Sequence, residues 1–384
     1  MIRGAVLLTG PLGLGHEMMT RSCAALLEQS GWRTRRLDSI SLLGPARGVG
    51  HWVFDRMVAV PGLYDGLHFA HLRTGSRLAE LMDRGSSSRL VPALRAELDR
   101  EPAGLIFSVF ATGASAAARL ARQRPGLRTV VLCTDVTPHR LWVSEGTDLF
   151  LVTSRAAEAS VRRYLPRADV AVVPPPVRAE FYDAPSQDEA RKELDVPAGT
   201  PCVLVIDSGW GFGPLVESVS ALTRAGVHVL AVAGRQRAIE RRLRELARTT
   251  PNLTPFGYTD RVPELMAAAD VVVALPGATT CGEARVVGRQ LLLLDRMPGH
   301  GRDNLLHELE LGGAHVCGPG PAAVTASALA VLDQVPRPAP QAGSLPRWEP
   351  AYAAALARIG VDLHPYRREP TPRDAYAVPA PADL

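Results

Sequence analysis

The sequence predicts an α/β protein made of two Rossmann-like halves, each built on a parallel sheet. Short β-branched apolar runs alternate with segments of helical period along most of the 384 residues. Strand, glycine-rich turn and helix follow one another twice, in residues 5–29 and again in residues 202–225. A polar, proline-bearing stretch at residues 174–199 separates the two halves and predicts an interdomain linker. We therefore expect a first domain at residues 1–173 and a second at residues 200–334.

Composition is that of an ordinary soluble globular protein, with 46% apolar and 21% charged residues. No apolar run approaches the ~18 residues that a membrane span requires. The first residues enter a predicted strand directly and show no cleavage signal, so we expect no secretory signal peptide. The five cysteines are scattered and form no CxxC pair, which favours the reducing cytoplasm and argues against a structural zinc site.

Basic residues are almost all arginine, and Lys192 is the single lysine. A Walker phosphate loop and a lysine Schiff base both need a lysine in a specific setting, whereas Lys192 falls in the predicted linker. The net charge of +4 suits weak attraction to an anionic membrane surface. The chain has no basic run with interleaved aromatic residues, so we expect no nucleic-acid partner.

The first half carries its candidate chemistry at the ends of predicted strands. The expected strands are residues 5–9, 34–38, 104–107, 129–133 and 149–153, and the expected helices are residues 18–29, 112–124 and 155–164. The glycine-rich turn at residues 10–16 places His16 at a helix start, where the helix dipole disfavours imidazolium and lowers the pKa. A neutral imidazole can take a proton from a hydroxyl, so His16 is a candidate general base. The alternative is a histidine that only caps its helix.

A second group of candidates follows the predicted strand at residues 129–133. The segment Thr-Asp-Val-Thr-Pro-His-Arg-Leu-Trp at residues 134–142 lies at a strand end, where loops commonly carry function. Asp135 and His139 are candidates for orienting His16 or the acceptor. The alternative for Asp135 is a turn-forming side chain.

The second half opens with a strand at residues 202–206 and a glycine-rich loop before a helix. Gly209, Gly211 and Gly213 let the backbone approach a diphosphate, and the helix start faces it. Arg235 follows the next predicted strand and is a candidate phosphate partner, with an ordinary surface arginine as the alternative.

The clearest site signal lies in residues 270–304. The expected elements are a strand at residues 270–274, a helix after Pro276-Gly277, a strand at residues 290–294 and a polar loop at residues 298–304. Thr279 and Thr280 are expected to cap the helix, with Glu283 at the capping-box spacing from Thr280. Ligands sit outside the carboxyl ends of such strands, so Glu283 is a candidate for binding sugar hydroxyls beside a phosphate. The alternative is that Glu283 only caps its helix.

Four short motifs together resemble a family of glycosyltransferases. This family includes monogalactosyldiacylglycerol synthase, processive diacylglycerol glucosyltransferases and the N-acetylglucosaminyltransferase of peptidoglycan synthesis. The motifs are Gly-x-Gly-His at residues 13–16, Thr-Asp…His..Trp at residues 134–142, Gly-x-Gly-x-Gly-Pro at residues 209–214 and Pro-Gly-Ala-Thr-Thr-Cys-Gly-Glu-Ala at residues 276–284. The resemblance extends over nearly the whole chain to residue 332 and implies a GT-B fold, in which two Rossmann-like domains face a central cleft.

The resemblance also implies a role for each matching residue. His16 matches the proposed catalytic base, with Asp135 as a second catalytic residue, and Glu283 matches the residue that holds the ribose of UDP. The implied donor-binding residues are Gly209, Gly211, Gly213, Arg235, Tyr258, Gly277, Thr279, Thr280, Glu283, His300 and Asn304, and the implied acceptor-binding residues are Gly15, His139 and Trp142. His300 and Gly301 replace the Gln-Glu pair that the family loop usually carries.

The implied activity is transfer of a hexose from a nucleotide sugar, expected to be UDP-linked, to a hydroxyl of a lipid acceptor such as diacylglycerol. His16 would deprotonate the acceptor in one inverting displacement. Because the chain has no D-x-D motif, we expect neither a metal ion nor another cofactor. The alternatives are a soluble natural-product acceptor, a UDP-sugar 2-epimerase on the same fold, and a non-catalytic nucleotide-binding protein.

Residues 49–81 form a long amphipathic stretch that resembles the membrane-facing helical region of the family. Its aromatic residues, among them Trp52, Phe54 and Phe69, and its arginines suit docking at a lipid interface. We therefore expect a cytoplasmic protein with peripheral contact to the inner face of an anionic membrane, and a pair of ordinary packed helices is the alternative. Residues 335–384 are expected to hold a Pro-rich segment, a helix that crosses back to the first domain, and a disordered tail.

Overall fold

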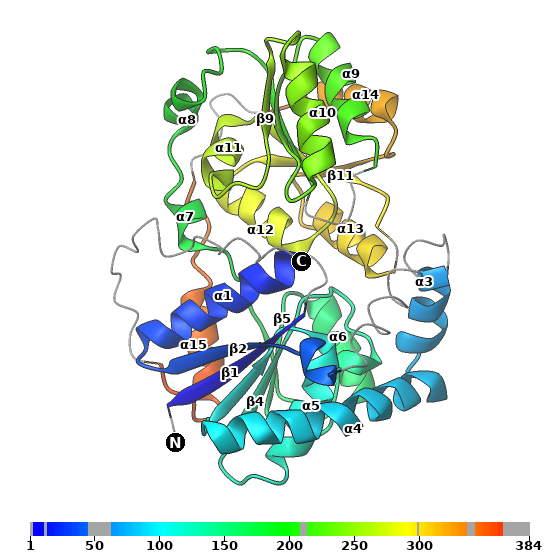
Figure 1. The fold of residues 1–384 in the computed structure, drawn as a ribbon, viewed down its shortest axis with the longest axis vertical. Helices are drawn as coiled ribbons and strands as arrows, with labels where there is room; N and C mark the ends of the chain where they lie inside the picture. The colour runs from blue at the N-terminus through cyan, green and yellow to red at the C-terminus, as the bar shows by residue number, and fades with distance from the viewer. Residues whose placement is uncertain are drawn as a thin grey trace.

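The computed structural model describes residues 3–10, 14–44, 63–207, 213–297, 299–335 and 342–363. It shows two α/β domains, one above the other in Figure 1, with α1 and α12 lying where the two domains meet. Each domain holds a six-stranded sheet, and the strands pair in parallel wherever a pairing is described. The predicted class, two Rossmann-like domains with parallel sheets, is therefore confirmed.

The first sheet has the strand order β2-β1-β3-β4-β5-β6. Its strands are β1 (Gly4–Thr9), β2 (Arg33–Asp38), β3 (Leu105–Ser108), β4 (Arg128–Cys133), β5 (Leu149–Val152) and β6 (Val170–Val172). Its helices are α1 (Leu14–Gln29), α4 (Arg77–Arg100), α5 (Ala111–Ala121) and α6 (Arg155–Tyr164), with short turns η1 (Ser41–Leu43), α3 (Leu63–Leu67), η2 (His68–Leu72) and η3 (Arg140–Trp142). Helix α1 begins four residues before the expected start, which brings His16 into its first turn.

The second sheet has the strand order β12-β11-β10-β7-β8-β9. Its strands are β7 (Cys202–Ile206), β8 (His228–Val232), β9 (Leu253–Phe256), β10 (Val271–Ala274), β11 (Gln290–Leu294) and β12 (Ala314–Cys317). Its helices are α9 (Leu215–Arg224), α10 (Arg237–Ala247), α11 (Val262–Ala268), α12 (Ala278–Val287), α13 (His300–Glu310) and α14 (Pro321–Leu332).

Both sheets are covered by helices on their two faces, and this burial explains their sequence pattern. Leu7 and Phe107 in the first sheet and Leu204 and Val272 in the second are at most 1% exposed. Strands buried on both faces are continuous apolar runs rather than alternating ones, which is why the sequence marks them clearly. Truncating such a side chain to alanine typically costs roughly 2–5 kcal/mol.

The strand order reverses once in each sheet, and both reversals face the region between the domains. In the first sheet the reversal lies between β1 and β3, and in the second between β7 and β10. Parallel sheets bind ligands in the crevice outside the carboxyl ends of strands at such a point. The residues that follow β1, β3, β7 and β10 are therefore expected to form the site.

The segment at residues 174–199, expected to be a linker, is packed on the second domain. It contains α7 (Ala179–Tyr182) and α8 (Gln187–Glu193). Phe181 is fully buried, and Arg191 forms a buried ion pair with Asp270 at 2.9 Å. This connection is therefore a built part of the structure, and its side chains can reach the site.

The chain returns to the first domain in α15 (Glu349–Ala357), as the resemblance implied. The Trp348 indole N–H donates to the Val177 carbonyl at 2.8 Å, and Arg358 pairs with Asp169. No helix in the described ranges is both long and apolar enough to cross a membrane. The expectations for Trp52, Phe54, Gly209, Gly211 and the C-terminal tail lie outside the described residues.

Candidate active site

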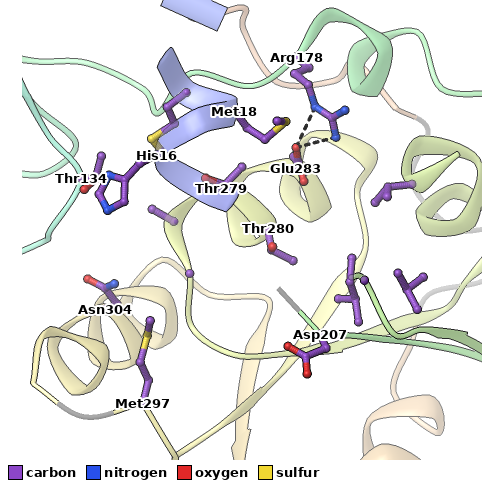
Figure 2. Close-up of a pocket in the computed structure, with 18 of the residues that line it drawn as sticks. His16, Met18, Thr134, Arg178, Asp207, Thr279, Thr280, Glu283, Met297 and Asn304 are labelled. Carbon is purple, nitrogen blue, oxygen red and sulfur yellow. Dashed lines mark hydrogen bonds and ion pairs between the residues drawn. The ribbon is translucent and has the colours of Figure 1, made fainter. Parts of the chain in front are cut away.

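One cavity lies between the two domains at the predicted strand ends, and Figure 2 shows it. From the first domain it is lined by Gly15, His16, Met18, Met19, Thr134 and Asp135. From the second domain it is lined chiefly by Asp207, Gly234, Tyr258, Gly277, Thr279, Thr280, Glu283, Met297, His300 and Asn304. Ten of the residues implied by the resemblance are therefore brought to one cavity, although the two domains contribute them from distant parts of the chain.

His16 lies in the first turn of α1 with its ring held in one orientation. Its Nδ1–H donates to the Val109 carbonyl at 3.0 Å, and Phe110 packs edge-on against the ring at 5.1 Å between centroids. A hydrogen bond from Nδ1 fixes the tautomer in which Nε2 is the proton acceptor. The imidazole is thus prepared to accept a proton.

Burial lowers the pKa of His16 below its ordinary value, against the opposing effects of Asp135 and the Val109 hydrogen bond. The expected direction of the pKa shift is therefore found. Its main cause is loss of solvent around the ring, and not the helix dipole that the sequence suggested.

Asp135 is buried at the cavity wall and belongs to a compact polar group. The Trp142 indole N–H donates to its Oδ2 at 2.8 Å, and His139 Nε2 lies 3.8 Å from the same oxygen. Burial raises the pKa of Asp135, but the nearby His300 and His139 and the Trp142 hydrogen bond lower it overall. His139 and Trp142 are themselves buried, and neither is among the described residues that line the cavity.

The donor side begins at α12, whose start differs from the sequence expectation. The helix begins at Ala278 with Gly277 as its N-cap, and no side chain caps it. Thr279 and Thr280 therefore lie inside the first turn, and the expected Thr280–Glu283 capping box is wrong. The first backbone N–H groups of a helix have no partner within that helix. They make the cavity end of α12 suitable for a phosphate group.

Glu283 lies in the middle of α12, is 5% exposed, and is paired with an arginine that the sequence did not indicate. Arg178 donates to Glu283 Oε1 from Nη2 at 3.1 Å and from Nε at 3.3 Å (Figure 2). Burial raises the pKa of Glu283, and the Arg178 guanidinium opposes that increase. Arg178 lies 105 positions away in the expected linker, so no local pattern could have identified it.

The outer part of the cavity carries an aromatic platform. The guanidinium of Arg235 lies over the Tyr258 ring at 5.1 Å, and Tyr258 is 45% exposed. Asp207, which the sequence analysis did not select, is buried at the end of β7 and accepts a hydrogen bond from Gln236 at 2.5 Å. Gly213 adopts a φ of 88°, a conformation that favours glycine.

The expected polar loop at residues 298–304 is mostly helical, because α13 begins at His300. Asn304 is buried and bridges the domains. Its Oδ1 accepts from the Val136 N–H at 3.3 Å, and its Nδ2 donates to the Pro276 carbonyl at 3.2 Å. The residue thus joins the first-domain loop to the strand end that precedes α12.

Gly15 lies at a close contact between the two domains. A Cβ atom at this position would lie 2.9 Å from Thr279 Oγ1, which is shorter than real Cβ contacts. The glycine therefore allows the start of α1 to pack against the start of α12. No group of three or more His, Cys, Asp or Glu side chains among the described residues is arranged to hold a metal ion.

Two facing Rossmann-like domains with a cavity between them define a GT-B fold. Residues 213–307 match the glycosyltransferase family 28 C-terminal domain. The fold resembles the sucrose-phosphate synthase of Thermosynechococcus elongatus, with a TM-score of 0.54, 16% identity, and coverage of 93% of this chain and 96% of that one. The GT-B fold and the glycosyltransferase resemblance are both confirmed.

Curated relatives place the similarity among lipid glycosyltransferases. The processive diacylglycerol beta-glucosyltransferase of Bacillus licheniformis is 26% identical over 51% of this chain and 52% of its own length. The probable monogalactosyldiacylglycerol synthase 2 of Oryza sativa subsp. indica is 27% identical over 49% of this chain and 42% of its own length. The chain thus spans about half the length of the curated relatives it matches.

Proposed function

We propose that the protein is a hexosyltransferase that moves a hexose from a UDP-sugar to a hydroxyl group of a lipid acceptor such as diacylglycerol. The observation that carries this proposal is that His16, the start of α12 and Glu283 line one cavity (Figure 2). His16 offers a proton acceptor, and the second domain offers groups suited to a nucleoside diphosphate. The matched family 28 domain and the lipid glycosyltransferase relatives support the same proposal.

In the proposed reaction, His16 Nε2 takes the proton of the acceptor hydroxyl as its oxygen attacks the anomeric carbon. A new C–O bond forms, and the bond between the anomeric carbon and the diphosphate oxygen breaks on the opposite face. The electron pair leaves with UDP, and the configuration at the anomeric carbon inverts. The N–H groups at the start of α12 stabilise the charge on the leaving diphosphate. The proposed reaction uses no metal ion or other cofactor.

The donor contacts follow from the same geometry. Glu283 accepts hydrogen bonds from the ribose hydroxyls through Oε2, because Arg178 already occupies Oε1. Tyr258, with Arg235 over its ring, offers a stacking surface for the base at the outer end of the cavity. Asp135 keeps the loop at residues 134–142 in place through Trp142 and His139.

The lipid acceptor is supported by a surface of the first domain. Leu78, Leu81 and Met82 are exposed at helical spacing on α4, with Arg77 and Arg84 also exposed, and Phe69 is exposed on η2. Apolar side chains with arginines around them suit docking at an anionic lipid interface. We therefore also propose peripheral membrane association.

Co-sedimentation with anionic vesicles tests that association. The wild-type protein is expected to pellet with vesicles at low salt and to be released as salt is added, because salt screens the arginines. Leu78→Ser with Leu81→Ser should weaken binding while circular dichroism remains that of the wild type, since both side chains are exposed. If the wild-type protein stays in the supernatant at low salt, membrane association is wrong and a soluble acceptor becomes the better proposal.

The function itself is tested by turnover of a panel of UDP- and dTDP-sugars with a lipid extract and with soluble acceptors. The proposal expects UDP release that requires the lipid extract, together with a glycosylated lipid product. Transfer only to soluble acceptors would support the natural-product alternative. Conversion of the UDP-sugar without transfer would indicate an epimerase, and UDP binding without turnover would indicate a non-catalytic protein.

A further inference from the structure

The N-cap and first turn of α13 are held by the first domain through three polar contacts. The Gly299 N–H donates to Asp65 Oδ1 at 2.5 Å. The Arg73 guanidinium donates to both carboxylate oxygens of Asp303, at 2.9 and 3.2 Å, and the Thr137 hydroxyl donates to one of them. Each contact joins residues that are more than 160 positions apart and belong to different domains.

His300 lies between these contacts and lines the cavity. Gly299 precedes it with a φ of 65°, and a Cβ atom there would lie 2.4 Å from the Tyr64 ring. The His68 ring, which is fully buried, lies 6.3 Å from the His300 ring between centroids. The position of His300 therefore depends on how closely α13 packs against α3 and η2.

Arg73 connects Asp303 on α13 to other residues of the first domain. Its backbone carbonyl accepts from the Tyr164 hydroxyl, and its guanidinium lies 5.8 Å from the Phe69 ring centroid. Its side chain is 33% exposed and that of Asp303 is 14% exposed. A partly exposed pair of this kind usually contributes little to stability. Its loss should therefore leave both domains folded.

We propose that Arg73 and Asp303 are positioning residues that hold His300 and the start of α13 against the cavity, so that the acceptor-side residues 63–75 set the affinity for the donor sugar. The expected effect on donor affinity rests on the proposed function, whereas the contact between Arg73 and Asp303 does not. The contact itself can be tested without any substrate. Neither residue touches the reacting atoms in this account, since both act through α13.

Charge reversal and its rescue test the pair. The variants are Arg73→Asp, Asp303→Arg and the double variant that exchanges the two charges. Arg89→Asp, on an exposed turn of α4, is the control with the same change of charge. Hydrogen–deuterium exchange of residues 299–306 reports the contact, and donor kcat/KM and KM report its consequence.

Each single variant is expected to exchange faster in residues 299–306 and to lose about tenfold in donor kcat/KM, mainly through KM, because a displaced His300 weakens binding of the donor sugar equally in the ground state and the transition state. UDP affinity should change much less, since Glu283 and Tyr258, which are proposed to hold the ribose and the base, do not belong to α13. The double variant should recover most of both losses, and Arg89→Asp should match the wild type.

If hydrogen–deuterium exchange in residues 299–306 is unchanged in both single variants, Arg73 and Asp303 do not hold the start of α13, whatever the activity. Faster exchange with unchanged donor kcat/KM would show that this contact does not set the affinity for the donor sugar. A double variant as impaired as the single variants would show that the charges do not act as a pair. If the wild-type protein transfers no sugar at all, the proposed function fails, while the exchange data still decide whether Arg73 and Asp303 hold α13.

Discussion

The two walls of the cavity are assembled in different ways. In the second-domain wall, one stretch at residues 277–304 supplies eight of the described lining residues, including those of α12 and the start of α13, and the others lie at the ends of β7 and β8 or follow β9. On the first-domain side, the described lining residues come from the beginning of α1 and from the loop after β4, and the His16 ring is held by the Val109 carbonyl, which follows β3. The matched family 28 domain, at residues 213–307, falls in the second domain. The stretch proposed to bind the donor can therefore be identified from local sequence, whereas the orientation of the proposed base depends on tertiary structure.

The same comparison separates binding from chemistry. Glu283, Tyr258 and the start of α12 are proposed to hold UDP, and they all belong to the second domain. His16 is proposed to act only in the transfer step, from the first domain. Variants in the second-domain wall should therefore change UDP affinity, whereas variants of His16 should change turnover.

The largest effect is expected for His16→Ala. Loss of the general base should cut turnover by about 10²-fold or more, because base catalysis typically contributes that much. UDP affinity, measured by calorimetry, should stay close to that of the wild type. His315→Ala, on β12 in the second sheet, is the matched control and should be fully active. Near-normal turnover of His16→Ala would remove His16 from the mechanism.

Glu283→Gln should act on the other wall. UDP affinity is expected to fall about tenfold, because a neutral amide replaces a charged acceptor of the ribose hydroxyls. Thermal stability should fall as well, since Arg178 loses its buried partner. Glu308→Gln, which breaks the partly buried pair with Arg285 in the same domain, is the control. Lowered stability with unchanged UDP affinity would leave Glu283 with a structural role alone.

Gly15→Ala tests the contact between the walls. The new Cβ would meet Thr279 Oγ1 at 2.9 Å, so either the Thr279 side chain must rotate or α1 and α12 must move apart. We expect turnover to fall by roughly threefold to tenfold, because small displacements of reacting groups are costly. Thr279→Ala removes the opposing oxygen. The double variant should therefore be no slower than Thr279→Ala alone, and a further loss would show that the close approach is not the cause.

The smallest expected effect is the change of kcat/KM with pH near neutrality. Because burial lowers the pKa of His16 below 6.5, its Nε2 is already free of a proton at pH 7. The value of kcat/KM should therefore rise with pH below about 6.5 and change less than about twofold between pH 7 and 8. A pH–rate profile measures this directly. An apparent pKa above 7 that disappears in His16→Ala would contradict the burial of the imidazole.

Much of the fold could be predicted because its strands are short, fully apolar and separated by glycine and proline. The strands expected in the first half, for example, lie within one residue of β1 to β5. The short edge strand β6 was missed, although its three residues, Val170, Ala171 and Val172, are all apolar. Three residues are fewer than the four to eight that indicate a strand in a sequence.

The site was predicted in part, and the misses share one cause. Thr280 and Glu283 have capping-box spacing, yet α12 begins at Ala278. A side-chain cap contributes only about 1 kcal/mol, so packing against the first domain can override it. Arg178 and the bridging role of Asn304 depend on contacts across more than 100 positions. Such contacts leave no trace in the spacing of neighbouring residues.

The most direct test of the account is an experimental structure of the protein with UDP bound. We expect the ribose hydroxyls within hydrogen-bond distance of Glu283, the diphosphate at the start of α12, and its distal phosphate on the side of the cavity that faces His16. That arrangement would show that the second domain binds the nucleotide and that the first domain supplies the base. UDP bound elsewhere, or bound with its ribose hydroxyls out of hydrogen-bond reach of Glu283 Oε2, would contradict it.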